Sequence, residues 1–119
     1  ISVLGLSFKK NTDDIRESKS IPFVKLLLKN KINVKVHDPM SLDNFKKIFK
    51  NRIKYCNTVS ECINDSDCCV IMTGWDEYRK FTSSYFKNYM KNPKIVDAQR
   101  IFKKENFSDI PFTAIGLGN

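Results

Sequence analysis

Short apolar segments alternate along this chain with segments of helical periodicity, and this alternation restricts the fold more than any other feature. Each apolar segment is rich in Val, Ile, Cys or Phe, which predicts a β-strand. Strands separated by helices need right-handed crossovers, which produce a parallel sheet. We therefore expect an α/β fold: a doubly wound, mostly parallel, Rossmann-like sheet of five to six strands flanked by helices. The expected strands are residues 1–8, 33–37, 53–56, 68–73, 94–97 and 112–115.

Apolar residues at helical spacing mark the segments between the strands as amphipathic helices. Pro22 suits the first turn of the first helix, with Ser18 or Ser20 as its cap. Thr73 stands three residues before Asp76 and predicts a capping box in front of the fourth helix. The stripes are Ile21, Val24, Leu27 and Leu28, then Leu42, Phe45, Ile48 and Phe49, and finally Tyr78, Phe81, Tyr85, Phe86 and Tyr89, with a short third helix at 59–64.

The length and composition favour one globular domain that spans residues 1–119. Hydrophobic residues make up 41% and charged residues 29% of the chain, which excludes a disordered tail or a fibrous repeat. No apolar run is long enough to cross a membrane. The formal net charge of +8 favours an anionic partner but does not separate a nucleotide from a nucleic acid or an acidic membrane surface.

Cysteine and histidine spacing predicts no metal site. Cys68 and Cys69 are adjacent in an apolar run and are expected to be core thiols, and the single histidine, His37, is far from them in sequence. Free thiols and the lack of a secretory leader are typical of the cytoplasm. Because the chain begins on an apolar strand without a methionine, we expect a fragment of a longer protein.

In an open parallel sheet, ligands bind beyond the carboxyl ends of the strands. The longest expected loop, residues 9–20, follows the first strand and is polar, which is typical of a functional loop. No G-x-G-x-x-G follows that strand, and the chain has no GK[ST] phosphate loop. Side-chain cations and loop amides would therefore have to bind any phosphate.

Residues 5–18 read GLSFKKNTDDIRES, and this stretch resembles the G-L-[AS]-F-K-x-x-T-D-D-x-R-x-S motif that opens the C-terminal domain of the UDP-glucose/GDP-mannose dehydrogenase family. Further segments resemble later family motifs in the expected order, so the resemblance covers essentially the whole chain. They are VHDP at 36–39, TGWDEY at 73–78, VD at 96–97 and IGLG at 115–118.

The resemblance implies a C-terminal domain that binds a nucleotide-sugar such as a UDP-sugar. The complete enzyme would oxidise the C6 alcohol of the sugar to a carboxylate in two NAD-dependent steps and would be a homo-oligomer. NAD would be bound mainly by a missing N-terminal domain, and no catalytic residue falls in this chain. We therefore expect the isolated domain to bind its ligand without turnover.

Residue by residue, the family's F-K pair falls on Phe8 and Lys9, which implies that the backbone of this segment and the Lys9 ammonium contact the nucleotide-sugar. Arg16 falls on the arginine that approaches the phosphates of NAD. Both cations follow the first strand in one polar loop, and we expect the two together to hold a diphosphate. Thr12, Asp13 and Asp14 are expected to shape that loop, by pairing with Arg16 or by capping the following helix.

One departure from the family pattern affects substrate binding. The family's D-G-R, whose arginine contacts substrate, corresponds here to Asp97-Ala98-Gln99, so that Gln99 stands at the arginine position. Arg100 could substitute from the next position, although a shift of one residue in an extended segment turns the side chain to the other face. The substrate-binding residues are therefore expected among Phe8, Lys9, Gln99 and Arg100.

We expect neither a nucleic-acid nor a membrane partner, but two other functions remain compatible with the sequence. A nucleic-acid-binding module would use the basic run at 46–54, and a degenerate regulatory domain would keep the fold without its ligand, which Gln99 suggests. Trp75 could stack on a base, but a large aromatic residue at a helix start more often packs in the core. His37, without a partner in sequence, is expected to be structural or exposed.

Overall fold

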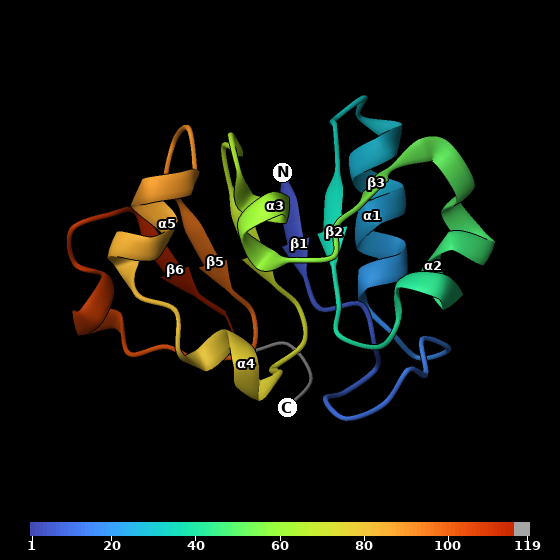
Figure 1. The fold of residues 1–119 in the computed structure, drawn as a ribbon, viewed down its shortest axis with the longest axis horizontal. Helices are drawn as coiled ribbons and strands as arrows, with labels where there is room; N and C mark the ends of the chain where they lie inside the picture. The colour runs from blue at the N-terminus through green and yellow to red at the C-terminus, as the bar shows by residue number, and fades with distance from the viewer. Residues whose placement is uncertain (116–119) are drawn as a thin grey trace.

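A six-stranded, all-parallel sheet forms the centre of the molecule (Figure 1). The computed structural model describes residues 1–115. The expected doubly wound fold is confirmed, and each predicted strand is present in a shorter form. In spatial order the strands are β3 (Lys54–Tyr55), β2 (Lys35–His37), β1 (Ser2–Leu4), β4 (Cys69–Ile71), β5 (Ile95–Asp97) and β6 (Phe112–Ala114).

The helices differ from the expectation at one place. A single helix from Tyr78 to Tyr89 was expected, and this prediction is wrong, because the chain forms two short helices there. Thr82 is extended and accepts a hydrogen bond from the Tyr85 N–H at 3.3 Å, which starts a new helix. The helices are α1 (Ser20–Lys29), α2 (Leu42–Phe49), α3 (Val59–Ile63), α4 (Asp76–Arg79) and α5 (Ser83–Tyr89), with 3₁₀ turns at Lys50–Arg52 and Lys104–Phe107.

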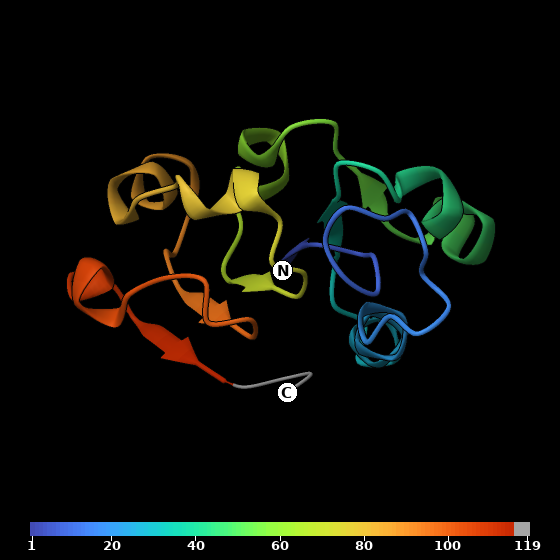
Figure 2. The same ribbon diagram turned by 90° about the horizontal axis from the view of Figure 1, so that it is seen from below.

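The sheet has a hydrophobic core on each face, and adjacent residues of β1 belong to different cores. Val3 packs in the core that contains Val24 of α1 and Phe45 of α2. Leu4 packs in the other core, with Val59 of α3 and further residues of α4 and α5. Figure 2 shows α1 and α5 on opposite sides of the sheet. Burial on both faces explains why the strands are continuously apolar in sequence.

The helix caps differ from those predicted. Neither Ser18 nor Ser20 is the N-cap of α1, because Lys19 occupies that position without a side-chain capping bond. The Ser18 Oγ does accept the Ser20 N–H at 3.1 Å just before the helix. The capping box at Thr73 is wrong, because Trp75 occupies the N-cap position of α4 and makes no side-chain capping bond. The Thr73 hydroxyl instead donates to the Ser7 carbonyl at 2.9 Å, across two loops.

The described residues 1–115 contain no helix that is long and apolar enough to cross a membrane, and no group of three or more potential metal ligands. The thiols are free; Cys56, Cys62 and Cys69 are buried and Cys68 is half-buried. Burial raises the pKa of Cys69 to about 12, as expected for a core thiol. Of the expected closing motif at 115–118, the residues after Ile115 lie outside the described part of the chain.

Candidate functional site

The strand order reverses between β1 and β4, because the chain passes from β1 to β2 on one side and from β4 to β5 on the other. The loops that leave β1 and β4 therefore diverge, and a crevice forms at this switch point. Gly5 leaves β1 with φ of 99°, and a Cβ added to it would lie 2.4 Å from the Thr73 Cβ and backbone N. Glycine is needed here because both the close approach and the backbone conformation exclude a side chain.

Asp38, which follows β2, connects three strand ends. Its buried Oδ2 accepts hydrogen bonds from the Leu6 N–H at 2.7 Å, the Ser7 N–H at 3.3 Å and the Trp75 indole N–H at 3.0 Å. Its Oδ1 accepts the backbone N–H groups of residues 40 and 41, each at 2.8 Å. The carboxylate is thereby fully used in holding loops, which leaves it no acid or base role.

Two serine hydroxyls also hold the loop after β1 in place. Ser20 donates to the Gly5 carbonyl at 2.8 Å, and Ser7 donates to the Lys9 carbonyl at 2.8 Å. The Phe8 N–H donates to the Asp14 carbonyl at 2.7 Å, which closes the intervening residues into a compact turn. These bonds hold the backbone on which Lys9 stands.

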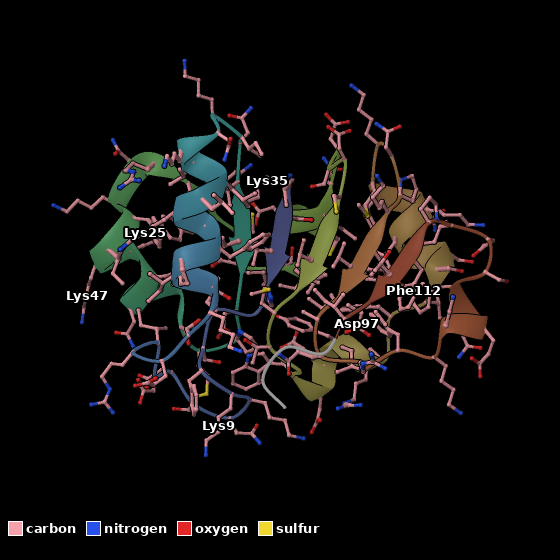
Figure 3. The ribbon with its side chains drawn as sticks, turned by 180° about the vertical axis from the view of Figure 1, so that it is seen from behind. Lys9, Lys25, Lys35, Lys47, Asp97 and Phe112 are labelled. Carbon is pink, nitrogen blue, oxygen red and sulfur yellow. The ribbon has the colours of Figure 1, made fainter. Side chains whose placement is uncertain are left out.

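A cleft of about 380 Å³ opens at this switch point. Four cationic side chains and only one carboxylate, Glu17, are among its lining residues, so that the cleft favours an anionic ligand. Figure 3 shows Lys9 beyond the carboxyl edge of the sheet, while Lys25 and Lys47 stand on α1 and α2. The lining consists of Ser7, Phe8, Lys9, Lys10, Glu17, Lys19, Met72, Thr73, Gly74, Arg79, Gln99 and Ile101.

Three of the four residues expected to bind substrate line this cleft. Phe8 and Lys9 form part of one wall, and the Phe8 side chain is 54% exposed. Gln99 lies on the wall that follows β5, where its amide donates to the Met72 carbonyl at 3.0 Å. Arg100 is not among the lining residues, and its backbone is left-handed, with φ of 54°. Of the last two residues, Gln99 lines the cleft, while which of them contacts substrate stays a prediction.

Arg16 is not among the lining residues of the cleft that contains Lys9, so the expected joint binding of one diphosphate by these two cations stays a prediction. Arg16 lines a second hollow, of about 640 Å³, between this loop and residues of α2. The Asp14 carboxylate accepts hydrogen bonds from its Nε at 3.1 Å, its Nη2 at 2.8 Å and its backbone N–H at 2.9 Å. These bonds from Arg16 lower the pKa of Asp14 to about 2. The expected pairing within the loop is confirmed, and it fixes Arg16 to its own turn.

Trp75 and His37, the aromatic and histidine side chains near the strand ends, have structural roles. Trp75 is buried and donates to Asp38, which confirms the packing interpretation over base stacking. His37 is buried, and its Nδ1 lies 2.9 Å from the hydroxyl of Tyr78. Burial lowers the pKa of His37, so that it is neutral near pH 7. The basic run at 46–54 lies outside the cleft, and two of its cations, Lys46 and Arg52, stand over aromatic rings.

Two carboxylates that determine the shape of the site were not predicted from sequence. Asp38 follows β2 and Asp97 is the last residue of β5, and each accepts backbone N–H groups of the next loop. Asp97 accepts those of Gln99 at 3.1 Å and Phe102 at 2.9 Å. The available signal was that both fall within family-like motifs at strand ends. An aspartate followed by a turn residue is compatible with a loop-holding role as well as with a solvated one.

Comparison with known proteins agrees with this arrangement. Residues 2–104 match the family model described as the UDP-glucose/GDP-mannose dehydrogenase family, UDP binding domain. The chain is 34% identical over 120 residues to a UDP-glucose 6-dehydrogenase of Rickettsia bellii and 32% identical over 118 residues to one of Bacillus subtilis. These alignments cover 100% and 99% of this chain, but 28% and 26% of the relatives. The chain thus spans little more than a quarter of their length.

Solved structures give the same result. A UDP-glucose dehydrogenase from Pyrobaculum islandicum aligns over 97% of this chain and 24% of its own, with a TM-score of 0.77 and 26% identity. An NDP-N-acetyl-D-galactosaminuronic acid dehydrogenase from Methanosarcina mazei aligns over 99% of this chain and 24% of its own, with a TM-score of 0.78 and 26% identity. The fold around the cleft is therefore one that these dehydrogenases contain.

Proposed function

This chain belongs to the UDP-glucose/GDP-mannose dehydrogenase family as a copy of its UDP binding domain, and we propose that its cleft between the β1 and β4 loops binds the diphosphate of a UDP-sugar or a related nucleotide-sugar. The single observation that carries this proposal is the position of Lys9. Its side chain lines the cleft at the switch point of the sheet, on a loop that hydrogen bonds hold in place.

The charge of the cleft supports a diphosphate over a neutral ligand. Lys9 and Lys19 line it together with further cations, against the carboxylate of Glu17. Phe8 adds an exposed aromatic face beside the ammonium groups. Gln99 replaces an arginine of the family pattern and offers a neutral amide to the ligand, so we expect a weaker contact there than an arginine would make.

We also propose that the chain is the C-terminal domain of an NAD-dependent nucleotide-sugar dehydrogenase that oxidises the C6 alcohol to a carboxylate. The named relatives support this proposal, because they are dehydrogenases about four times as long as the chain. NAD would accept hydride in the complete enzyme. This domain would bind and orient the nucleotide end of the substrate, while the catalytic groups would lie in the rest of that enzyme. The free thiols support a reducing cytoplasmic location.

The residues of this chain fit a peripheral contact with NAD and not a dinucleotide site. A guanidinium has five N–H donors, and Asp14 takes two of those of Arg16, so that the others can face a phosphate. The Arg16 side chain is 87% exposed in an open hollow that also contains Lys47. In the intact enzyme, Arg16→Ala should raise the Michaelis constant for NAD more than that for the nucleotide-sugar, and steady-state kinetics with the reverse order would refute the assignment.

The proposed cleft is tested by titrating the chain with UDP in a calorimeter. We expect saturable binding that Lys9→Ala weakens roughly ten-fold, because a charge-assisted hydrogen bond to phosphate is lost. Lys25→Ala, a change to an exposed lysine on α1, is the matched control and should leave the affinity unchanged. If the chain does not bind UDP but binds a short oligonucleotide with steep salt dependence, the proposal is contradicted and a nucleic-acid-binding module is indicated.

A further inference from the structure

Ion pairs connect the loop after β1 to helix α4 beside the cleft. Lys10 belongs to the loop after β1, whereas Asp76 and Arg79 belong to α4, which follows β4. The Lys10 Nζ lies 3.0 Å from the Asp76 Oδ1, and the Arg79 Nε lies 3.6 Å from the same oxygen. Lys10 and Arg79 both line the cleft, while Asp76 is not among the lining residues. One carboxylate oxygen therefore holds two cleft cations from outside.

These contacts are easily exchanged. The side chains of Lys10, Asp76 and Arg79 are 45%, 73% and 50% exposed, so that water and salt screen the pairs. Arg79 is at ion-pair distance from Asp76, but the separation is too long for a hydrogen bond. Its planar guanidinium matches phosphate geometry, and a diphosphate offers several charged oxygens where Asp76 offers one shared oxygen. A diphosphate in the cleft would therefore compete well for both cations.

Arg16 and Arg79 differ in this respect. Arg16 donates three hydrogen bonds to the Asp14 carboxylate within one turn and lines a separate hollow. Arg79 has one longer contact and lines the cationic cleft itself. Of these two arginines, Arg79 is the one that the structure places where Lys9 also stands.

We propose that Lys10 and Arg79 are further phosphate-binding residues of this cleft, and that Asp76 is the counter-ion that they exchange for the diphosphate. The inference rests on the proposed function, because it needs a diphosphate in the same cleft. In the absence of ligand, these ion pairs keep the two cations at the mouth of the cleft and limit their mutual repulsion. When the ligand enters, phosphate oxygens replace Asp76, and the carboxylate becomes solvated.

Single variants separate the phosphate contacts from the rest of the ligand. Arg79→Gln and Lys10→Gln should each weaken UDP binding about five-fold, because each removes one charge-assisted contact with phosphate. Uridine has no phosphate, so its affinity should not change. Lys25→Gln is the control for loss of one positive charge at a distance from the cleft. Equal UDP affinity for the native chain and for both cleft variants would overturn the inference while the proposed function stands.

A double-mutant cycle tests the exchange itself. Asp76→Asn should tighten UDP binding about three-fold in the native background, because the cations no longer have to leave a carboxylate. In the Lys10→Gln/Arg79→Gln background, the same change should have no effect. Glu17→Gln removes a carboxylate that lines the cleft, and its effect should persist in both backgrounds as a purely through-space change.

The outcomes distinguish a failure of the counter-ion exchange from a failure of the proposed function. If Asp76→Asn tightens binding equally in both backgrounds, Asp76 acts only through space and the exchange is refuted. If Asp76→Asn weakens UDP binding, Asp76 orients the two cations and the exchange is likewise refuted. If the native chain binds no UDP at all, the proposed function is wrong and this inference fails with it.

Discussion

The floor of the cleft and its outer loop use the same types of polar residue in opposite ways. We call Gly5, Asp38, Thr73 and Trp75 the cleft floor: Thr73 lines the cleft, and the other three hold the loops around it. The outer loop comprises residues 8–17. Asp38 is buried and accepts five hydrogen bonds from three separate segments of the chain. Asp14 in the outer loop is half-buried, with 35% of its side chain exposed, and its carboxylate serves one neighbour, Arg16. The comparison indicates that the floor determines the fold, while the outer loop is free to determine binding.

The largest expected effect is that of Gly5→Ala in the cleft floor. The added Cβ would meet the backbone of Thr73 at 2.4 Å, and φ of 99° is strained for alanine, so we expect a loss of about 4 kcal/mol in the free energy of unfolding or a failure to fold. Urea unfolding provides the measurement. Gly74→Ala is the matched control, because its Cβ would lie 3.2 Å from the end of the Ile101 side chain and should cost about 1 kcal/mol or less.

Asp38→Asn should have the next largest effect. The amide nitrogen would have to face N–H donors that now reach a carboxylate oxygen, so we expect the free energy of unfolding to fall by about 2 to 3 kcal/mol. The indole N–H of Trp75 would lose a charged acceptor, and its fluorescence reports on that contact. A variant with native unfolding and unchanged Trp75 emission would show that the floor does not depend on this carboxylate.

Part of the fold and of the candidate site could be predicted from the sequence, and part could not. The β-strands and α1 follow from apolar runs and helical spacing, and Lys9 and Gln99 reach the cleft because both lie in loops that follow strands. The role of Asp38 was not predicted, since donors such as Leu6 and Trp75 are more than thirty residues away along the chain. Arg100 is not among the cleft residues, and its left-handed backbone is a property that residue spacing does not encode.

The two short helices α4 and α5 illustrate a further limit. The aromatic residues from Tyr78 to Tyr89 have helical spacing throughout, and all of them except the exposed Tyr89 pack in one core, as in a continuous helix. The break depends on Thr82, whose hydroxyl accepts the backbone N–H of Tyr85 and so begins a second helix. Threonine inside a periodic segment can occupy a helix interior or a cap, and tertiary packing selects between the two.

A smaller effect is expected from the titration of His37 beside the cleft floor. Burial lowers the pKa of His37 below 6.5, although the carboxylates of Glu77 and Asp38 oppose this shift, and Tyr78 faces Nδ1. As the pH falls, His37 therefore binds a proton in the unfolded chain before it does so in the folded chain. Below about pH 6.5, stability should fall as the pH falls, by at most about 1.4 kcal/mol per pH unit.

The measurement is urea unfolding between about pH 5 and pH 7.5, a range that brackets the ordinary histidine pKa. His37→Gln keeps a polar group against Tyr78 and removes the titration, so its stability should depend less on pH in that range. Because His37 is buried, added salt should leave the slope of the native chain nearly unchanged. A slope that survives in His37→Gln would assign the pH dependence to another group.

The smallest effect is expected for Asp14→Asn in the outer loop. Its pKa is lowered to about 2, so any stability that the pair with Arg16 contributes is present above the ordinary pKa of 3.8 and is lost as the pH falls through about 2. The pair is exposed, and salt screens it. We therefore expect Asp14→Asn to unfold at the same urea midpoint as the native chain at pH 7. A shift as large as that of Asp38→Asn would mean that the outer loop also holds the fold, and the contrast between the two regions would fail.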